Sequence, residues 1–264
     1  MLNTKLLSLQ LWSVRDLFSG DYAEMIRKVA GMGYNGIEFA GGYGNLSSDQ
    51  MNALLKECGL VAIGSHVPYK QLTDNINAVI EYNLAIGNKY IICPGAPFKV
   101  KEDYIKMCDV FNNFGEICGK NGLLFGYHNH SYEFYPLEDG SIGYDILLNG
   151  TDPDKVFFEM DTGWVGFAGC DPVEYCKKFP GRFKLAHIKD YKAERSADGK
   201  AIQTDIGTGV MDFTKVIPAL KENGTHYLIV EQEEGIGESI EYVNRSLKNL
   251  RKTIDNLELV GKLG

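Results

Sequence analysis

The sequence predicts an α/β protein built as a single (β/α)8 barrel over residues 1–264. Three observations favour this fold. Short apolar runs alternate with longer amphipathic segments from one end of the chain to the other, which is typical of repeated strand-helix units and a parallel sheet. Eight such units fit within the 264 residues, and no linker rich in Pro, Gly or Ser divides them. An open doubly wound sheet would usually have fewer strands and often a phosphate-binding loop.

The eight apolar runs are expected to form the strands of the barrel. In chain order they span residues 6–12, 36–40, 60–66, 90–94, 123–128, 156–161, 183–188 and 227–232. Each is short, apolar and bounded by turn-forming residues, as strands of a parallel sheet usually are. In such a barrel the carboxyl ends of all strands open onto one mouth, where residues far apart in sequence converge.

Two of the intervening segments show the helical pattern clearly. Residues 21–33 carry apolar side chains at helical spacing, and Gly31 or Gly33 can end the helix. Residues 47–59 begin with two serines, either of which can cap a helix, and Gly59 can terminate it. A strand follows each segment, as the barrel requires.

Composition excludes several classes of function. The formal net charge of −8 works against a nucleic acid or a membrane surface as partner, because phosphate binding needs clustered Lys and Arg. No apolar run approaches the roughly 18–20 residues needed to cross a bilayer. Six cysteines form no CxxC pair, and the first residues lack the pattern of a secretory signal, so a cytoplasmic protein with free thiols is expected.

The most informative feature is a set of polar residues at the ends of four apolar runs in the second half of the chain. These residues are His128, Asp161, His187 and Glu231. Two imidazoles and two carboxylates at one barrel mouth suit a divalent metal such as Mn, Mg, Co or Zn. The alternative is that each residue only forms hydrogen bonds within the mouth.

Seven segments spread over nearly the whole chain carry a family resemblance. They are GYNGIEFAG, SHVPY, YHNHSYEF, EMDTGW, HIKD, DIGTGVMDF and IVEQE. Their order and spacing resemble the xylose isomerase-like TIM-barrel superfamily, in particular its sugar phosphate isomerase/epimerase branch, which is similar to inosose isomerases and dehydratases and to ketose 3-epimerases. The motifs are specific for the superfamily and much less so for the substrate.

The resemblance implies one divalent metal ion, held by residues from the last four strands. Three positions match the ligands of the family residue for residue: Asp161, His187 and Glu231. The first ligand departs from the family pattern, because YHNHSYEF stands where the sugar epimerases carry a glutamate. His128 is the first choice for this position, followed by Glu133 and His130.

The implied activity is that of a metal-dependent sugar isomerase or epimerase. A metal on a carbonyl and its neighbouring hydroxyl stabilises the enediolate that forms when the adjacent carbon loses a proton. Glu231 is the expected general base, and His130, Glu133 or Lys189 could return the proton. Lys189 could instead bind an oxyanion or a phosphate, or be a solvated lysine.

Polar and aromatic residues of the other strands could contact a sugar or cyclitol. Glu38 and His66 are polar residues within apolar strands, and Gln10 is either a third contact or a hydrogen-bonded core amide. Trp12 and Trp164 follow strands one and six, where they could stack on a sugar ring or simply pack in the core.

Three other functions compete with the isomerase. A lyase, such as an inosose dehydratase or a 3-keto-glycoside eliminase, would begin with the same proton abstraction, and imidazole in place of the first glutamate favours it. A non-catalytic sugar-binding barrel is a second alternative. An endonuclease IV-like nuclease would need more histidines than the five present and a basic surface. A homodimer is possible on family grounds.

Overall fold

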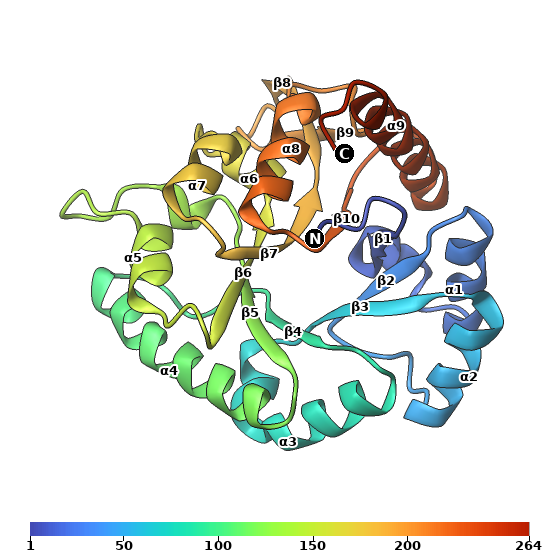
Figure 1. The fold of residues 1–264 in the computed structure, drawn as a ribbon, viewed down its shortest axis with the longest axis horizontal. Coiled ribbons are helices and arrows are strands. Elements are labelled where there is room, and N and C mark those ends of the chain that lie inside the picture. Colours follow the sequence, from blue (N-terminus) through green and yellow to red (C-terminus); the bar gives the residue numbers. More distant parts are fainter. Residues whose placement is uncertain (264) are drawn as a thin grey trace.

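The computed structural model describes residues 1–263 and confirms the predicted barrel; residue 264 of the expected domain lies outside the described part. Eight parallel strands close on themselves in the order β1-β10-β7-β6-β5-β4-β3-β2 (Figure 1). Their bounds are β1 Leu7–Gln10, β2 Gly36–Ala40, β3 Val61–His66, β4 Tyr90–Cys93, β5 Leu124–His128, β6 Val156–Asp161, β7 Phe183–Ile188 and β10 Tyr227–Val230.

Helices surround the barrel on its outside (Figure 1). They are α1 Tyr22–Gly31, α2 Ser48–Cys58, α3 Tyr69–Ala85, α4 Lys101–Lys120, α5 Gly143–Gly150, α6 Thr162–Phe167, α7 Pro172–Lys178, α8 Phe213–Asn223 and α9 Ser239–Leu259, with 3-10 turns η1 Leu11–Leu17 and η2 Tyr132–Phe134. Both helices expected above are confirmed: Asp21 caps α1, and Ser47 forms a capping box with Gln50 at the start of α2. No helix in the described chain is long and apolar enough to span a membrane.

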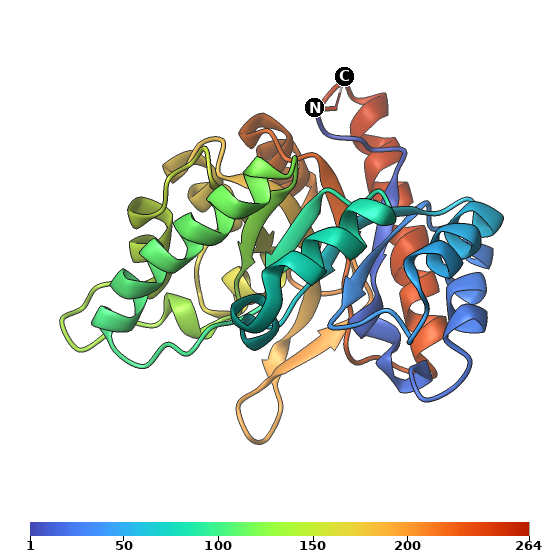
Figure 2. The same ribbon diagram turned by 90° about the horizontal axis from the view of Figure 1, so that it is seen from below.

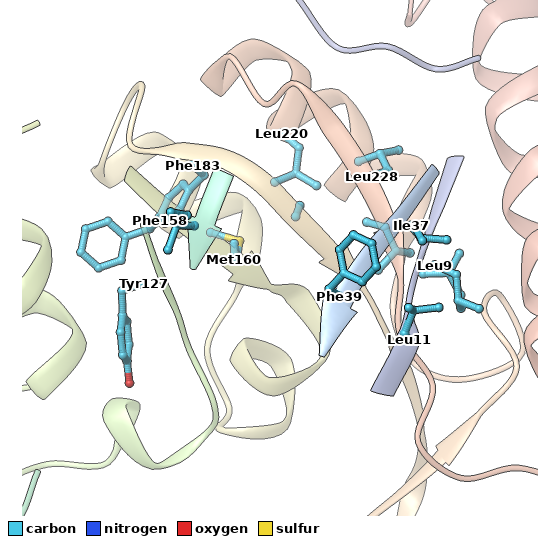
Figure 3. Close-up of a cluster of buried hydrophobic side chains, with 14 of the residues drawn as sticks. Leu9, Leu11, Ile37, Phe39, Tyr127, Phe158, Met160, Phe183, Leu220 and Leu228 are labelled. Atoms are coloured by element: carbon cyan, nitrogen blue, oxygen red, sulfur yellow. The ribbon is translucent and has the colours of Figure 1, made fainter. Parts of the chain in front are cut away.

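Side-chain alternation along the strands produces two apolar layers. The outer layer lies between strands and helices and includes Leu9, Phe39, Tyr127 and Phe158 (Figure 3). The inner layer fills the barrel below the mouth; it consists of Ile63, Tyr90, Ile92, Phe157, Leu185 and Ile229. Successive side chains of a strand point to opposite faces of the sheet. Polar residues on the inner face near the strand ends therefore lie between this inner apolar layer and the mouth of the barrel.

A hairpin interrupts the repeating pattern between β7 and α8. Its strands, β8 Asp190–Arg195 and β9 Ala201–Thr204, pair antiparallel apart from the barrel sheet. Figure 2 shows the hairpin projecting from one end of the barrel, with both chain termini at the opposite end. The sequence does not predict these strands, because β8 is mostly exposed and charged and β9 is only four residues long.

The ends of two expected strands differ from the structure. The first strand ends at Gln10, because its side-chain oxygen accepts a hydrogen bond from the Trp12 backbone amide and turns the chain into η1. The last strand ends at Val230, so that Glu231 is the first residue beyond it. Both differences place functional candidates on the rim of the barrel.

Candidate metal centre

The barrel brings the four strand-end candidates together. His128, Asp161, His187 and Glu231 are all buried, and each offers a ligand atom within 4.8 Å of the others. This proximity follows from the register, since Asp161 pairs with His187 across β6 and β7 and the strands run parallel. Their roles as metal ligands stay predictions, but the geometry that such a role requires is present.

Glu159 joins this group and was missed by the sequence reading. It pairs with His128 across β5 and β6, and it lies two residues before Asp161, so both carboxylates point into the barrel. The signal was available in the run VFFEMD, because a period of two from Asp161 selects Glu159. The run looked like a uniformly buried strand with one polar end, and this concealed the second inward carboxylate.

Three carboxylates contact the imidazoles of the cluster and hold them in defined orientations. Oε2 of Glu159 lies 3.0 Å from Nδ1 of His128, which leaves Nε2 of that ring free for another partner. Oε2 of Glu38 lies 2.6 Å from Nε2 of His187, and Nδ1 of the same ring lies 2.8 Å from Oε2 of Glu231. A carboxylate on the far nitrogen of an imidazole is the usual arrangement behind a metal-binding histidine.

A second close group consists of His66, His128, Glu159 and His187. Nε2 of His66 lies 2.7 Å from Oε2 of Glu159, the same oxygen that contacts His128. These are hydrogen-bond distances. We therefore interpret Glu159 as the carboxylate that positions the surrounding imidazoles rather than as a ligand of a second ion.

The donors present fit a divalent cation. Oδ1 of Asp161 accepts a hydrogen bond from the Trp164 backbone amide, and Oδ2 is fully buried 2.8 Å from the Lys189 ammonium. A buried carboxylate is costly unless a cation neutralises it, so Oδ2 already lies in a position that accepts positive charge. Imidazole nitrogens and carboxylate oxygens in this number are the ligand set of Zn, Mn and related ions.

Burial and charge crowding shift the acidities within the cluster. Burial and the neighbouring Glu159 raise the pKa of Glu38 to about 7, and burial raises the pKa of Asp161 to about 6. Burial lowers the pKa of His128 well below its usual range, so that ring is neutral and able to act as a ligand. For His187 the surrounding carboxylates outweigh burial and raise the pKa well above its usual range.

Lys189 completes the mouth from the end of β7. Its Nζ lies 2.8 Å from Oδ2 of Asp161, 2.9 Å from Oε2 of Glu231 and 2.9 Å from Oε1 of Glu233. The ammonium also lies 4.7 Å from the centre of the Trp164 ring. Lys189 is therefore a buried, fully paired cation, in contrast to the solvated lysine that was the alternative from sequence.

A cavity of about 300 Å³ opens beside this cluster. Its lining includes Trp12, His66, His128, His130, Glu231 and Glu233. Burial lowers the pKa of the His130 ring to about 4, so this part of the cavity lining is a neutral imidazole at pH 7. The carboxylates of the lining come from the segment after β10, whereas the imidazoles come from β3, from β5 and from the loop after β5.

The expected substrate contacts divide into three groups. Trp12 and His66 line the cavity, and Nε1 of Trp12 donates to Oε2 of Glu233 over 3.3 Å. Gln10 and Glu38 are fully buried and hydrogen-bonded to each other over 2.7 Å, so they support the cluster and are absent from the described lining. Trp164 covers the Lys189 ammonium and so borders the cluster.

Glu133 lies apart from the four-residue cluster. The Tyr127 hydroxyl donates to its Oε1 over 2.5 Å, and the His130 backbone amide donates to its Oε2 over 2.9 Å. Tyr127 is an outward-facing core residue packed against Phe111. Glu133 therefore shapes the loop that presents His130, and the structure does not bring it together with the candidate ligands.

Comparison with known proteins gives consistent results. The family model described as xylose isomerase-like TIM barrel matches residues 26–253. The inosose dehydratase of Clostridium beijerinckii is 25% identical over 176 residues, which cover 61% of this chain and 58% of that protein. The inosose dehydratase of Geobacillus thermodenitrificans is 27% identical over 172 residues, which cover 60% and 57%. The matched region thus spans less than two thirds of these curated relatives.

Solved structures cover the chain more completely. A sugar phosphate isomerase/epimerase from Parabacteroides distasonis is 30% identical, with a TM-score of 0.79 over 93% of this chain and 97% of that one. The IolI protein, solved with a zinc atom, is 16% identical with a TM-score of 0.73 over 98% and 99%, a likeness of fold.

Proposed function

Because the chain belongs to the xylose isomerase-like TIM barrel family, we propose that it is a metal-dependent enzyme that removes a proton next to a carbonyl group of a sugar or cyclitol. The observation that carries this proposal is the group His128, Asp161, His187 and Glu231, whose ligand atoms lie within 4.8 Å of one another beside the cavity. Bound there, a divalent ion would supply the Lewis acidity that makes a carbon next to a carbonyl acidic.

Glu231 is the residue best placed to take the proton. It lines the cavity, and the charges of Lys189 and His187 outweigh burial and hold its pKa well below the usual range. An ionised carboxylate at the reaction site is ready to act as a base without prior deprotonation. A base with so low a pKa depends on a strongly acidified substrate, which is what the ion provides.

His130 is a second residue of the cavity lining that could take part in the reaction. Burial lowers the pKa of its ring to about 4, so the ring is neutral at pH 7 and lines the cavity as a polar group for a substrate hydroxyl or carbonyl oxygen. Return of the proton to a neighbouring carbon would give isomerisation, and return to the other face of the same carbon would give epimerisation. Both outcomes start from the abstraction assigned to Glu231.

A dehydratase is the second candidate, and the donor set favours it. Within the described cavity lining, the carboxylates Glu231 and Glu233 come from the segment after β10, and imidazoles come from β3 and from the end of β5 with its following loop. An epimerase that removes the proton with one carboxylate and returns it with a second on the opposite face of the substrate would therefore lack the second carboxylate here. A β-hydroxyl can leave as water with the proton that Glu231 has taken, so this reaction needs no second carboxylate, and the relatives named inosose dehydratase carry out a reaction of that class by name.

Deuterium exchange tests the shared step and separates the outcomes. The purified, Mn- or Zn-loaded protein is incubated in D2O with an inosose and with a series of neutral ketoses, and spectra are recorded by NMR. Uptake of deuterium next to the carbonyl, lost in Glu231→Gln, is the expected result. Epimer or isomer signals indicate the first candidate, and an enone absorbance indicates the second. Metal-loaded protein that exchanges no proton in any of these compounds would refute the proposal.

A further inference from the structure

Lys189 occupies the same two oxygens that the proposed metal ion would use. Its ammonium lies 2.8 Å from Oδ2 of Asp161 and 2.9 Å from Oε2 of Glu231. The lysine side chain is 2% exposed, so bulk water offers it no alternative partner in this position. The stem is held in place by Gly163, where even an added Cβ would lie 2.7 Å from Cγ of Lys189.

The Lys189 ammonium and a divalent ion cannot both bind these two oxygens closely. A divalent ion on Asp161 and Glu231 would stand within a few ångströms of the ammonium, and like charges at that range repel strongly in a buried site. The ammonium must therefore shift when the ion binds, and the free energy of that shift subtracts from the binding free energy of the ion.

We propose that Lys189 is a built-in counter-ion that sets the metal affinity of the site, and that Glu233 receives its ammonium when the ion binds. This inference rests on the proposed metal-dependent function and concerns the regulation of the same site. Lys189 acts here as a positioning residue.

Glu233 is suited to receive the ammonium because it lies outside the ligand group and is already fixed. Its Oε1 lies 2.9 Å from Nζ of Lys189, and its Oε2 accepts from Nε1 of Trp12 over 3.3 Å. Its backbone amide donates to Oε1 of Gln203 on the β8–β9 hairpin over 2.7 Å. The face of the Trp164 ring, 4.7 Å from Nζ, remains a second partner that no metal ligand shares.

Replacement of Lys189 tests the proposal, because a counter-ion and a merely structural lysine predict opposite changes in metal affinity. In Lys189→Met the stem is kept and the charge is lost, so the dissociation constant for Zn or Mn, measured by competition with a chelating dye, is expected to fall by about tenfold or more. A merely structural lysine would give the opposite, since disturbance of a metal site weakens binding. Lys184→Met, on β7 and only partly buried, is the matched control and should bind like the wild type.

A double-mutant cycle tests the role of Glu233. Glu233→Gln should weaken metal binding in the protein that contains Lys189, because the displaced ammonium has lost its acceptor. The same substitution in the Lys189→Met background should have at least about a threefold smaller effect, since no ammonium remains to be accommodated. Equal effects in both backgrounds would overturn the assignment of Glu233. Thermal unfolding of each variant without metal identifies any that fail to fold.

The outcomes also separate this inference from the proposed function. Wild-type protein that binds one ion, with Lys189→Met binding equally or more weakly, overturns the inference and leaves the function intact. Protein that binds no ion in either form overturns both. Binding that appears only in Lys189→Met supports the inference in its strongest form, with the ammonium excluding the ion, and contradicts a metal-dependent function.

Discussion

Glu159 and His128 face each other across strands β5 and β6, with Oε2 of the carboxylate 3.0 Å from Nδ1 of the ring. The contact leaves the other ring nitrogen as the only one available to an ion. Glu159 also contacts His66 and His187, at 2.7 and 3.1 Å, so one fully buried carboxylate orders three imidazoles. The orientation of the imidazoles in the candidate metal centre therefore depends on a residue outside its group of candidate ligands.

Loss of the Glu159 carboxylate should weaken metal binding without removing a ligand. We expect Glu159→Gln to raise the dissociation constant for Zn by about 10–100-fold, because an amide holds the imidazoles less firmly. Titration against a chelating dye measures it, and Glu116→Gln on the surface helix α4 is the control. Unchanged affinity in Glu159→Gln would show that the imidazoles are ordered by other contacts.

The fourth ligand can be identified by metal content. Protein loaded with Zn and dialysed should retain about one equivalent, and His187→Ala and His128→Ala should both lose it. His226→Ala should retain it, since that ring bonds the Tyr90 hydroxyl next to the inner apolar layer. If His130→Ala rather than His128→Ala loses the ion, the fourth ligand is His130.

Glu133 should make the fold less stable as the pH rises. Burial raises its pKa to about 7, whereas in the unfolded chain it titrates near 4.5, so the folded state binds the extra proton between these values. Stability from this group is complete below about pH 4.5 and is lost as the pH rises through about 7. Between pH 5 and pH 8 the free energy of unfolding should therefore fall by roughly 3 kcal/mol less in Glu133→Gln than in the wild type. Urea unfolding at the two pH values measures this difference. An identical pH dependence in both proteins would contradict the assignment.

Gly163 should not tolerate a side chain. A Cβ there would lie 2.8 Å from Cβ of Lys189 and 2.9 Å from its backbone oxygen, and the backbone cannot move aside. Gly163→Ala is expected to lower the free energy of unfolding by about 1–3 kcal/mol. Gly31→Ala, in α1 with no atom within 4 Å of the added Cβ, should instead leave it unchanged or raise it by up to about 1 kcal/mol. Thermal or urea unfolding compares the two.

The barrel and the residues at its mouth could be predicted from local pattern. An apolar run predicts a strand because burial on both faces requires it, and the strand's final polar residue lies at the mouth because all strands run the same way. This logic predicts that His128, Asp161, His187 and Glu231 lie near one another, and the structure brings them together. Even the missed Glu159 obeys the same two-residue period.

Partnerships between strands were decided only by the tertiary structure. Barrel closure brings Glu38 of β2 to His187 of β7, two residues whose contact no local pattern reveals. Glu133 was a candidate ligand by its position in sequence, but a 3-10 turn directs it toward the Tyr127 hydroxyl. The sequence by itself determined which side chains reach the mouth, because that depends on strand period and direction. The structure decided which of them pair, because pairing depends on distances across the barrel that only closure sets.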